Sequence, residues 1–108
     1  MPAKRKGLLL VMMDIDPEHE EEFNRWYNEE HVPERLSIPG FISGRRFRAV
    51  EGSPKYLALF ELESPEVLNT QAYRHWLGEG RTEWTKRMSP RFKNFVRNVY
   101  VQIYPEER

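Results

Sequence analysis

The chain has 108 residues, and its 39% apolar and 13% aromatic content suits one small folded domain better than a disordered segment. Lys and Arg together number 17, as do Asp and Glu, so no net charge favours nucleic acid or an anionic membrane as a partner. The lack of cysteine excludes disulfides, thiolate metal sites and a cysteine nucleophile, and it is compatible with the cytoplasmic location that we expect.

The first predicted element is a strand at Gly7–Ile15 (GLLLVMMDI). Its unbroken apolar run is typical of a strand covered on both faces, and it is too short to cross a bilayer. Residues 1–6, which precede it, are expected to form a flexible tail.

A helix is predicted to follow, from Pro17 to about His31. Asp16 precedes it as a potential N-cap, and Pro17 suits the first turn because an N–H at that position has no helical partner. Pro33 lacks the N–H that an α-helix needs. We therefore expect the helix to end before Pro33 and residues 32–37 to form a separate helical turn.

The middle of the chain predicts a hairpin. A Pro39-Gly40 turn comes before a strand at 41–50, and the stretch 51–54 (EGSP) is typical of a tight connection. The second strand of the hairpin is predicted at 55–62.

The last third of the chain predicts a second helical region and a final strand. Ser64-Pro65 repeats the combination of cap and proline, and the helical region to Met88 should break at its two glycines. Residues 94–104 (NFVRNVYVQIY) are rich in β-branched and aromatic side chains, which favour a strand. Residues 105–108 are expected to be a C-terminal tail.

This order of elements predicts an α+β fold of the ferredoxin-like βαββαβ type in one domain, residues 7–104. Such a fold has a four-stranded antiparallel sheet with the helices on one face. The first strand nevertheless carries apolar residues on both faces, Leu8 on one and Leu9 on the other. An uncovered apolar face normally marks an interface, so we expect a homodimer in which the two sheets face each other.

The first helix ends in an aromatic stripe with two polar side chains. Counting by three and four residues places Phe23, Trp26, Tyr27, Glu30 and His31 on one helical face. Burial in a core explains the aromatic residues but not the carboxylate and the imidazole. The position of these two polar side chains at the end of the stripe therefore needs another explanation.

His31 is the candidate general acid or base, because imidazole titrates near neutral pH. Glu30 or Glu34 would orient it, and Tyr27 would donate a hydrogen bond to a substrate oxygen beside Trp26. The alternative for His31 is a structural role at the helix end, through hydrogen bonds to the last carbonyls and the helix dipole. For the two aromatic residues the alternative is a place in the core.

Arginines interrupt the apolar pattern of the strand at 41–50. A buried arginine needs a partner, and Arg45 or Arg46 would bind a substrate carboxylate, which the planar guanidinium fits. Glu61 on the third predicted strand and Arg97 on the fourth could form a network with such an arginine. The alternative to substrate binding is a salt bridge at the dimer interface.

No metal and no cofactor are expected. A metal site needs a cluster of ligands, whereas Glu30, His31 and Glu34 form a single group interrupted by Pro33. The stretch 78–80 (GEG) lacks the further glycine and the preceding strand of a nucleotide-binding loop.

Several stretches resemble the dimeric α/β-barrel superfamily, and more narrowly its EthD-like members. They are W-Y-x-x-E-H at 26–31, V-P-E-R-L at 32–36, I-P-G-F at 38–41 before the arginine-bearing strand, and K-Y-L-A-L-F-E-L-E-S-P-E at 55–66. The resemblance covers about residues 7–104. It implies the ferredoxin-like fold, a homodimer, and a pocket bordered by the end of the first helix.

That superfamily includes cofactor-independent monooxygenases, muconolactone isomerases, polyketide cyclases, haem-degrading enzymes and members with no known reaction, so the fold does not select a reaction. We expect a cofactor-independent enzyme that moves a proton in a carboxylated or phenolic, cyclic or aromatic-derived molecule, as an isomerase, cyclase or decarboxylase does. The alternatives are a cofactor-free monooxygenase and a non-catalytic dimer that binds a small molecule or is associated with stress.

Overall fold

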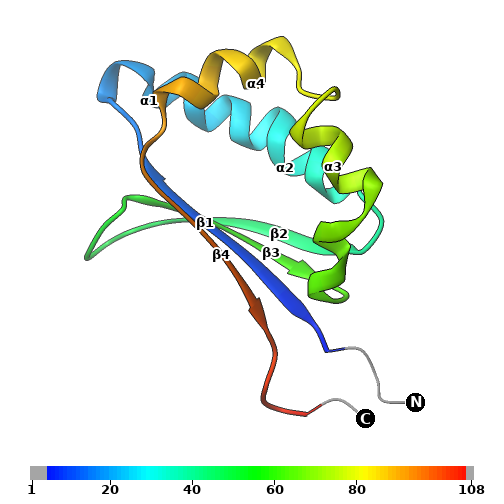
Figure 1. Cartoon of the computed structure of the whole chain (residues 1–108). Helices are drawn as coiled ribbons and strands as arrows, with labels where there is room; N and C mark the ends of the chain where they lie inside the picture. The colour runs from blue at the N-terminus through cyan, green and yellow to red at the C-terminus, as the bar shows by residue number, and fades with distance from the viewer. Residues whose placement is uncertain (1–4, 107–108) are drawn as a thin grey trace.

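Four antiparallel strands form one sheet with the helices on one face (Figure 1). The structure is a computed structural model that describes residues 5–106, so parts of both predicted tails, residues 1–4 and 107–108, lie outside the described residues. The strands are β1 (Gly7–Asp14), β2 (Phe41–Arg48), β3 (Tyr56–Leu62) and β4 (Lys93–Val101), in the order β2-β3-β1-β4. The predicted ferredoxin-like fold is confirmed.

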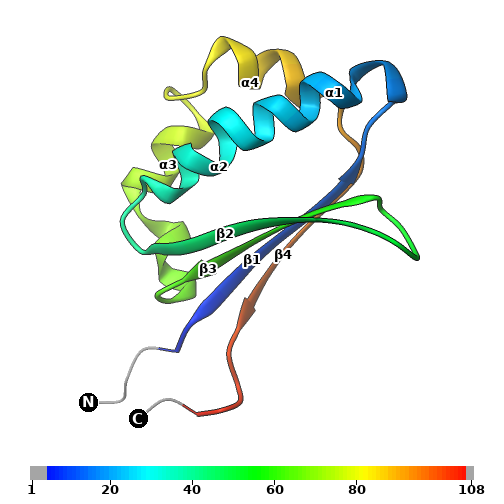
Figure 2. The same ribbon diagram turned by 180° about the vertical axis from the view of Figure 1, so that it is seen from behind.

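The strand register assigns each side chain to one of two faces. Leu9 pairs with Phe60 and Val99 on the face that the helices cover. Leu8 and the residues in phase with it lie on the opposite face, which we call the open face. No helix among residues 5–106 covers it (Figure 2). Its apolar residues are Leu8, Leu10, Met12, Phe47, Leu57, Leu59, Val96 and Tyr100.

The first helical segment runs from Pro17 to Leu36 without interruption. It consists of α1 (Pro17–Trp26), η1 (Tyr27–His31) and α2 (Val32–Leu36). The middle part η1 is a π-helical turn, in which the N–H of Val32 donates to the carbonyl of Tyr27 five residues earlier. This wider turn moves away the carbonyl with which the ring of Pro33 would collide in an α-helix. The predicted division at His31 is confirmed, since α2 begins at Val32, but a change of helix type marks it instead of a break in the helix.

The second helical region is divided more finely than the sequence predicts. It contains the 3₁₀ turns η2 (Pro65–Asn69) and η3 (Ser89–Arg91) and the short helices α3 (Gln71–Leu77) and α4 (Glu83–Met88). Hydroxyls of Ser64, Thr70 and Thr82 cap η2, α3 and α4 by accepting backbone N–H groups. No such side-chain cap forms at Asp16, whose carboxylate pairs with Lys93 at 2.6 Å.

The core lies between the helices and the covered face of the sheet. Phe23, Trp26, Phe60, Leu62 and Met88 are its largest fully buried side chains, and burial of each contributes roughly 1.5–3 kcal/mol to folding. Gly44 on β2 allows a close approach, because a Cβ there would lie 2.9 Å from the Phe60 ring and 3.2 Å from Val32. This packing holds the end of the first helical segment against the sheet. Within residues 5–106, no helix has the length and apolar character needed to span a membrane.

Candidate functional site

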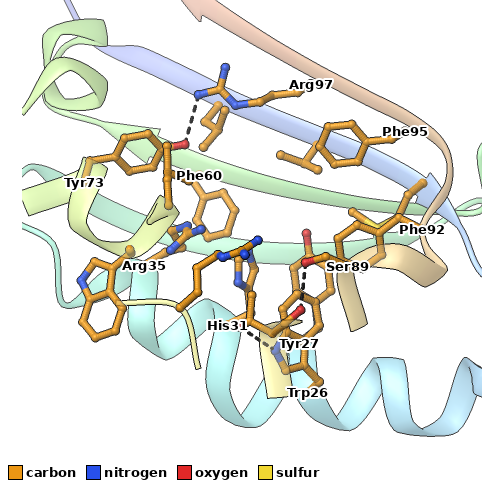
Figure 3. Close-up of a pocket in the computed structure, with 17 residues that line it drawn as sticks. Trp26, Tyr27, His31, Arg35, Phe60, Tyr73, Ser89, Phe92, Phe95 and Arg97 are labelled. Carbon is orange, nitrogen blue, oxygen red and sulfur yellow. Dashed lines mark hydrogen bonds between the residues drawn. The ribbon is translucent and has the colours of Figure 1, made fainter. Parts of the chain in front are cut away.

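A cavity of about 220 Å³ lies between the helices and strands β1, β3 and β4 (Figure 3). Its walls are mainly aromatic and aliphatic, with contributions from Phe60, Trp76, Phe92 and Phe95. At about 30 Å³ per water molecule the volume equals that of roughly seven waters. It lies below the roughly 300–1,000 Å³ of pockets for drug-sized ligands, so the cavity suits a small molecule of one or two rings.

The π-helical turn η1 brings Tyr27 and His31 to this cavity together with Trp26. Trp26 and His31 are five residues apart, which in an α-helix would separate them by about 140° around the axis. Here their rings stack, with centroids 4.6 Å apart and an interplanar angle of 27°. Tyr27 meets the imidazole edge-on at 4.9 Å. Two rings of the aromatic stripe therefore pack directly against His31.

His31 has an unusual electrostatic environment. Its Nδ1 is buried and has no hydrogen-bond partner among residues 5–106. Burial and the positive charges of Arg35 and Arg46 lower the pKa of His31 to about 3, so the imidazole is neutral near pH 7. Native proteins leave few buried polar atoms without a hydrogen-bond partner. A ligand atom or a water molecule could supply the partner for Nδ1 of His31.

Tyr27 is held in its protonated form. Burial raises the pKa of Tyr27 to about 12, although the nearby charges of Arg46 and Arg35 act in the opposite direction. A phenol with this pKa stays neutral at physiological pH and retains its O–H as a hydrogen-bond donor.

The charged residues that line the cavity are arginines, namely Arg35, Arg81 and Arg97. Arg35 is only 7% exposed, and its Nη1 donates to Oε1 of Glu34 at 3.2 Å. Its guanidinium lies over the ring of Tyr73 at 5.6 Å. Arg97 donates from Nη2 to the hydroxyl of the same tyrosine at 3.1 Å (Figure 3). No acidic side chain within residues 5–106 lines the cavity, so its described surface is positively charged.

The two glutamates predicted beside His31 lie behind the cavity wall. Glu34 pairs with Arg35, and burial raises the pKa of Glu34 while the arginine charge opposes the increase. Glu30 accepts hydrogen bonds at Oε2 from Trp26 Nε1 (3.1 Å), Thr82 (2.7 Å) and Thr85 (3.3 Å). Glu30 therefore fixes the indole of Trp26 and ties η1 to the start of α4.

Neither of the predicted substrate-binding arginines lines the cavity. Arg46 lies on the helix side of β2, with its guanidinium 4.4 Å from the centroid of the Tyr27 ring. It donates to the side-chain oxygens of Asn28 at 2.8 Å and Asn24 at 2.9 Å. Arg45 is on the open face, over the ring of Phe47 at 5.6 Å.

Glu61 and Arg97, the two partners suggested for an arginine of β2, cannot belong to one network. Glu61 is on the open face, where it accepts a hydrogen bond from Ser43 at 3.1 Å. Arg97 is on the helix side of β4, because it pairs with Val11, which lines the cavity. The two side chains therefore lie on opposite faces of the sheet.

Sequence reasoning did not select Arg35, Tyr73, Arg81 or Arg97 as site residues. A local signal existed for Arg35, which follows His31 by four residues. Arg97 likewise alternates with the apolar Phe95 and Val99 along a strand. Tyr73 and Arg81 carry no such signal, because only the fold brings them to the cavity. Among residues 5–106, no group of three or more His, Asp or Glu side chains is arranged to hold a metal ion.

Comparisons with known proteins support the fold. A family described as "Domain of unknown function (DUF4286)" matches residues 7–104. No curated protein matches the chain.

Solved structures match over almost the whole chain. A dimeric ferredoxin-like protein from an uncultured marine organism has 20% identity and a TM-score of 0.70, with coverage of 97% of this chain and 94% of that one. A putative antibiotic biosynthesis monooxygenase from Nitrosomonas europaea has 11% identity, 96% coverage of both chains and a TM-score of 0.65. The haem degrader MhuD from Mycobacterium tuberculosis, with two haems in its active site, has 12% identity, coverage of 94% and 99%, and a TM-score of 0.59. At these identities the likeness establishes the fold alone.

Proposed function

Because the chain belongs to the DUF4286 family, whose description gives no function, we propose its activity from the cavity. The protein is a cofactor-independent enzyme that removes a proton from a small aromatic or cyclic molecule. One observation carries this proposal: a neutral imidazole with an unpartnered nitrogen lines an aromatic cavity whose charged residues, among those that the structure describes, are all arginines. Such a site combines a proton acceptor with stabilisation of the anion that the proton leaves behind.

In this proposal His31 accepts the proton, and Tyr27 donates a hydrogen bond to a substrate oxygen. The pKa of about 3 makes His31 a weak base in the free protein. Part of that low pKa comes from the arginine charges. A negatively charged substrate beside Arg35 would offset them and raise the pKa of His31 when it binds. Substrate charge would thus activate the base.

The proposal favours an oxygen-dependent reaction, and the structural likeness to a putative antibiotic biosynthesis monooxygenase supports this choice. A substrate CH₂ group that loses a proton becomes a carbanion, which can itself reduce O₂. The overall change, R₂CH₂ + O₂ → R₂C=O + H₂O, balances without another reductant. The isomerase, cyclase and decarboxylase reactions begin with the same proton transfer and stay predictions, as does the narrower resemblance to EthD-like proteins.

The haem of MhuD is not carried over to this chain. The cavity of about 220 Å³ is smaller than pockets for drug-sized ligands, and a porphyrin is larger than most such ligands. The residues around the cavity therefore do not fit a haem, and no step of the proposal uses one.

We also propose that the protein is a homodimer whose open faces pack together. The open face carries eight apolar residues, and Phe47 and Tyr100 are 46% and 48% exposed. A second sheet of the same kind would bury these residues around a two-fold axis. The structural likeness to the marine protein, which is a dimeric ferredoxin-like protein, supports this arrangement.

Phenylpyruvate provides a test of the enzyme proposal, because it is a small aromatic acid with an acidic benzylic CH₂. We expect the protein to exchange these hydrogens for deuterium in D₂O, followed by NMR, or to consume O₂, followed with an oxygen electrode. The His31→Gln variant should lose about 100-fold or more of either rate with little change in melting temperature. An unchanged rate in this variant would contradict the role of His31.

The low pKa of His31 and the small cavity favour a second candidate, a non-catalytic protein that binds a small molecule. This candidate predicts saturable binding of an aromatic acid without deuterium exchange and without O₂ consumption. The same measurements on the wild-type protein therefore separate the two functions.

A further inference from the structure

Tyr73 on α3 joins two arginines that come from distant parts of the chain. The guanidinium of Arg35, from α2, lies over its ring at 5.6 Å. Arg97, from β4, donates to its hydroxyl at 3.1 Å. Figure 3 shows these three side chains at one end of the cavity, with Trp26 and Phe92 toward the other end. One end of the cavity is therefore cationic, and the other is aromatic.

Positive charge at the cationic end exceeds the negative charge that the described residues supply there. Arg35 is buried and has one carboxylate partner, Glu34. Burial lowers the pKa of Arg35, and the charge of Arg97 acts in the same direction, while Tyr73 and Glu34 oppose it. Arg81 adds a third guanidinium to the lining. Buried charge without compensation is costly, so an anion in the cavity would relieve this repulsion.

We propose that Arg35, Arg97 and the Tyr73 hydroxyl form a carboxylate-binding subsite, and that the cavity takes an aromatic monocarboxylate. This inference rests on the proposed role of the cavity as a small-molecule site but does not require catalysis. A guanidinium fits a carboxylate with two parallel hydrogen bonds. The Tyr73 oxygen accepts from Arg97, which leaves its own O–H free to donate to the same carboxylate.

The rest of the cavity defines the remainder of the ligand. Beyond the cationic end, the lining includes Trp26, Tyr27, Phe92 and Phe95, together with aliphatic residues of β1 and the hydroxyl-bearing Thr85 and Ser89 (Figure 3). These walls provide surfaces for a planar ring rather than partners for a second charged group. The subsite therefore reassigns carboxylate binding from Arg45 and Arg46 to residues that line the cavity.

The test compares 2-naphthoate with its neutral analogue of similar shape, 2-naphthamide, by isothermal titration calorimetry at pH 7.5. We expect the full-length protein to bind the carboxylate at least about tenfold more tightly than the amide, because charge-assisted hydrogen bonds are made only to the former. The Arg97→Met variant should reduce this ratio to about twofold or less. Arg74→Met provides the matched control, because it removes the same charge from an exposed position of α3 that does not line the cavity.

Two further variants protect the test against misfolding. Glu34→Gln combined with Arg35→Met removes the buried ion pair as a unit, so no unpaired carboxylate remains. Tyr73→Phe removes only the hydroxyl. Both should reduce the preference for naphthoate, and Arg74→Met should retain it.

Several results would overturn the subsite. They are equal affinity for the two probes, failure of the folded wild-type protein to bind either probe, and a loss in Arg74→Met as large as that in Arg97→Met. Displacement of naphthoate by millimolar inorganic phosphate would also overturn it, because the site would then recognise any anion. Arginine-dependent binding without deuterium exchange or O₂ consumption would support the subsite and contradict the enzyme. Deuterium exchange without a preference for the carboxylate would support the enzyme and contradict the subsite.

Discussion

Tyr27 separates two regions in which arginines have opposite surroundings. On the β2 side, Arg46 donates to two asparagines and lies over the ring of Tyr27. On the cavity side, Arg35 has a single carboxylate partner, Glu34. The neighbouring His31 has a buried Nδ1 with no hydrogen-bond partner among residues 5–106. Both regions contain cations beside aromatic rings. In the first region the guanidinium donates hydrogen bonds to two side chains, whereas in the second a buried polar atom has no partner among residues 5–106.

The contrast suggests how to separate structural polar groups from functional ones in this protein. A satisfied polar cluster fixes neighbouring elements relative to one another, and its loss should appear as lost stability. A cluster with like charges and unpartnered polar atoms can instead bind a ligand that supplies the missing partners, and its loss should appear as weaker ligand binding. Glu30 and His31 are adjacent in sequence but differ in this respect. Glu30 accepts three hydrogen bonds, whereas Nδ1 of His31 has no partner among residues 5–106.

The largest expected effect is at Arg46. Arg46→Met removes two hydrogen bonds and the contact with the Tyr27 ring, and we expect the free energy of unfolding to fall by about 2 kcal/mol. Urea denaturation at fixed protein concentration measures the change. Arg45→Met is the control, because its side chain lies on the open face, and its change should stay within about 0.5 kcal/mol. Equal losses in the two variants would refute the structural role of Arg46.

A smaller effect is expected at Glu30. Glu30→Gln keeps an oxygen acceptor but removes the charge that strengthens the bonds from Trp26, Thr82 and Thr85, and we expect a loss of about 1 kcal/mol. The exposed neighbour Glu29 supplies the control variant Glu29→Gln. The same urea titration compares the two variants. If both have the free energy of unfolding of the wild type, the hydrogen bonds of Glu30 do not stabilise the contact between η1 and α4.

The smallest effect concerns the acid sensitivity of the fold. The pKa of His31 is about 3 in the folded protein and about 6.5 when exposed, so the unfolded chain binds the proton first as the pH falls. Stability from this residue is therefore constant above the unfolded pKa and declines below it. Between pH 7 and pH 6 we expect the wild type to lose about 0.7 kcal/mol more than His31→Gln does. Parallel urea titrations at both pH values measure the difference, and identical pH dependence would mean that folding does not lower the pKa of His31.

The sequence predicts the sheet well because its signals are local. Alternating and continuous apolar runs mark the four strands, and each predicted strand overlaps the observed one. The helix type at the candidate site was not predictable in the same way. Pro33 is compatible both with a broken helix and with a π-helical turn, and only packing against β2, where Gly44 permits close approach, selects the second.

The candidate site is predictable only in part, because its charges come from three separate segments. His31, Tyr27 and Trp26 share one stretch of helix, and a helical count links Tyr27 to His31, four residues later. The stacking of Trp26 on His31, five residues apart, depends on the π-helical turn. Arg97 and Tyr73 meet Arg35 only after the sheet and the second helical region have formed. Glu30 matches the aromatic stripe in the helical count, yet its partners Thr82 and Thr85 lie more than fifty residues later, so its structural contacts could not be anticipated.

The π-helical turn has a consequence for how this site tolerates insertions and deletions. Each α-helical residue advances the chain by about 100° around the helix axis, whereas the wider turn at Tyr27–His31 uses one more residue to complete about one revolution. Deletion of one residue there would convert the turn to a regular α-helix and leave Trp26 and Arg35 on their present faces. The undeleted sequence in a regular α-helix would instead rotate Arg35 by about 100° relative to Trp26. Homologous sequences that lack one residue at this turn are therefore expected to present the same residues to their cavities on either side of the gap.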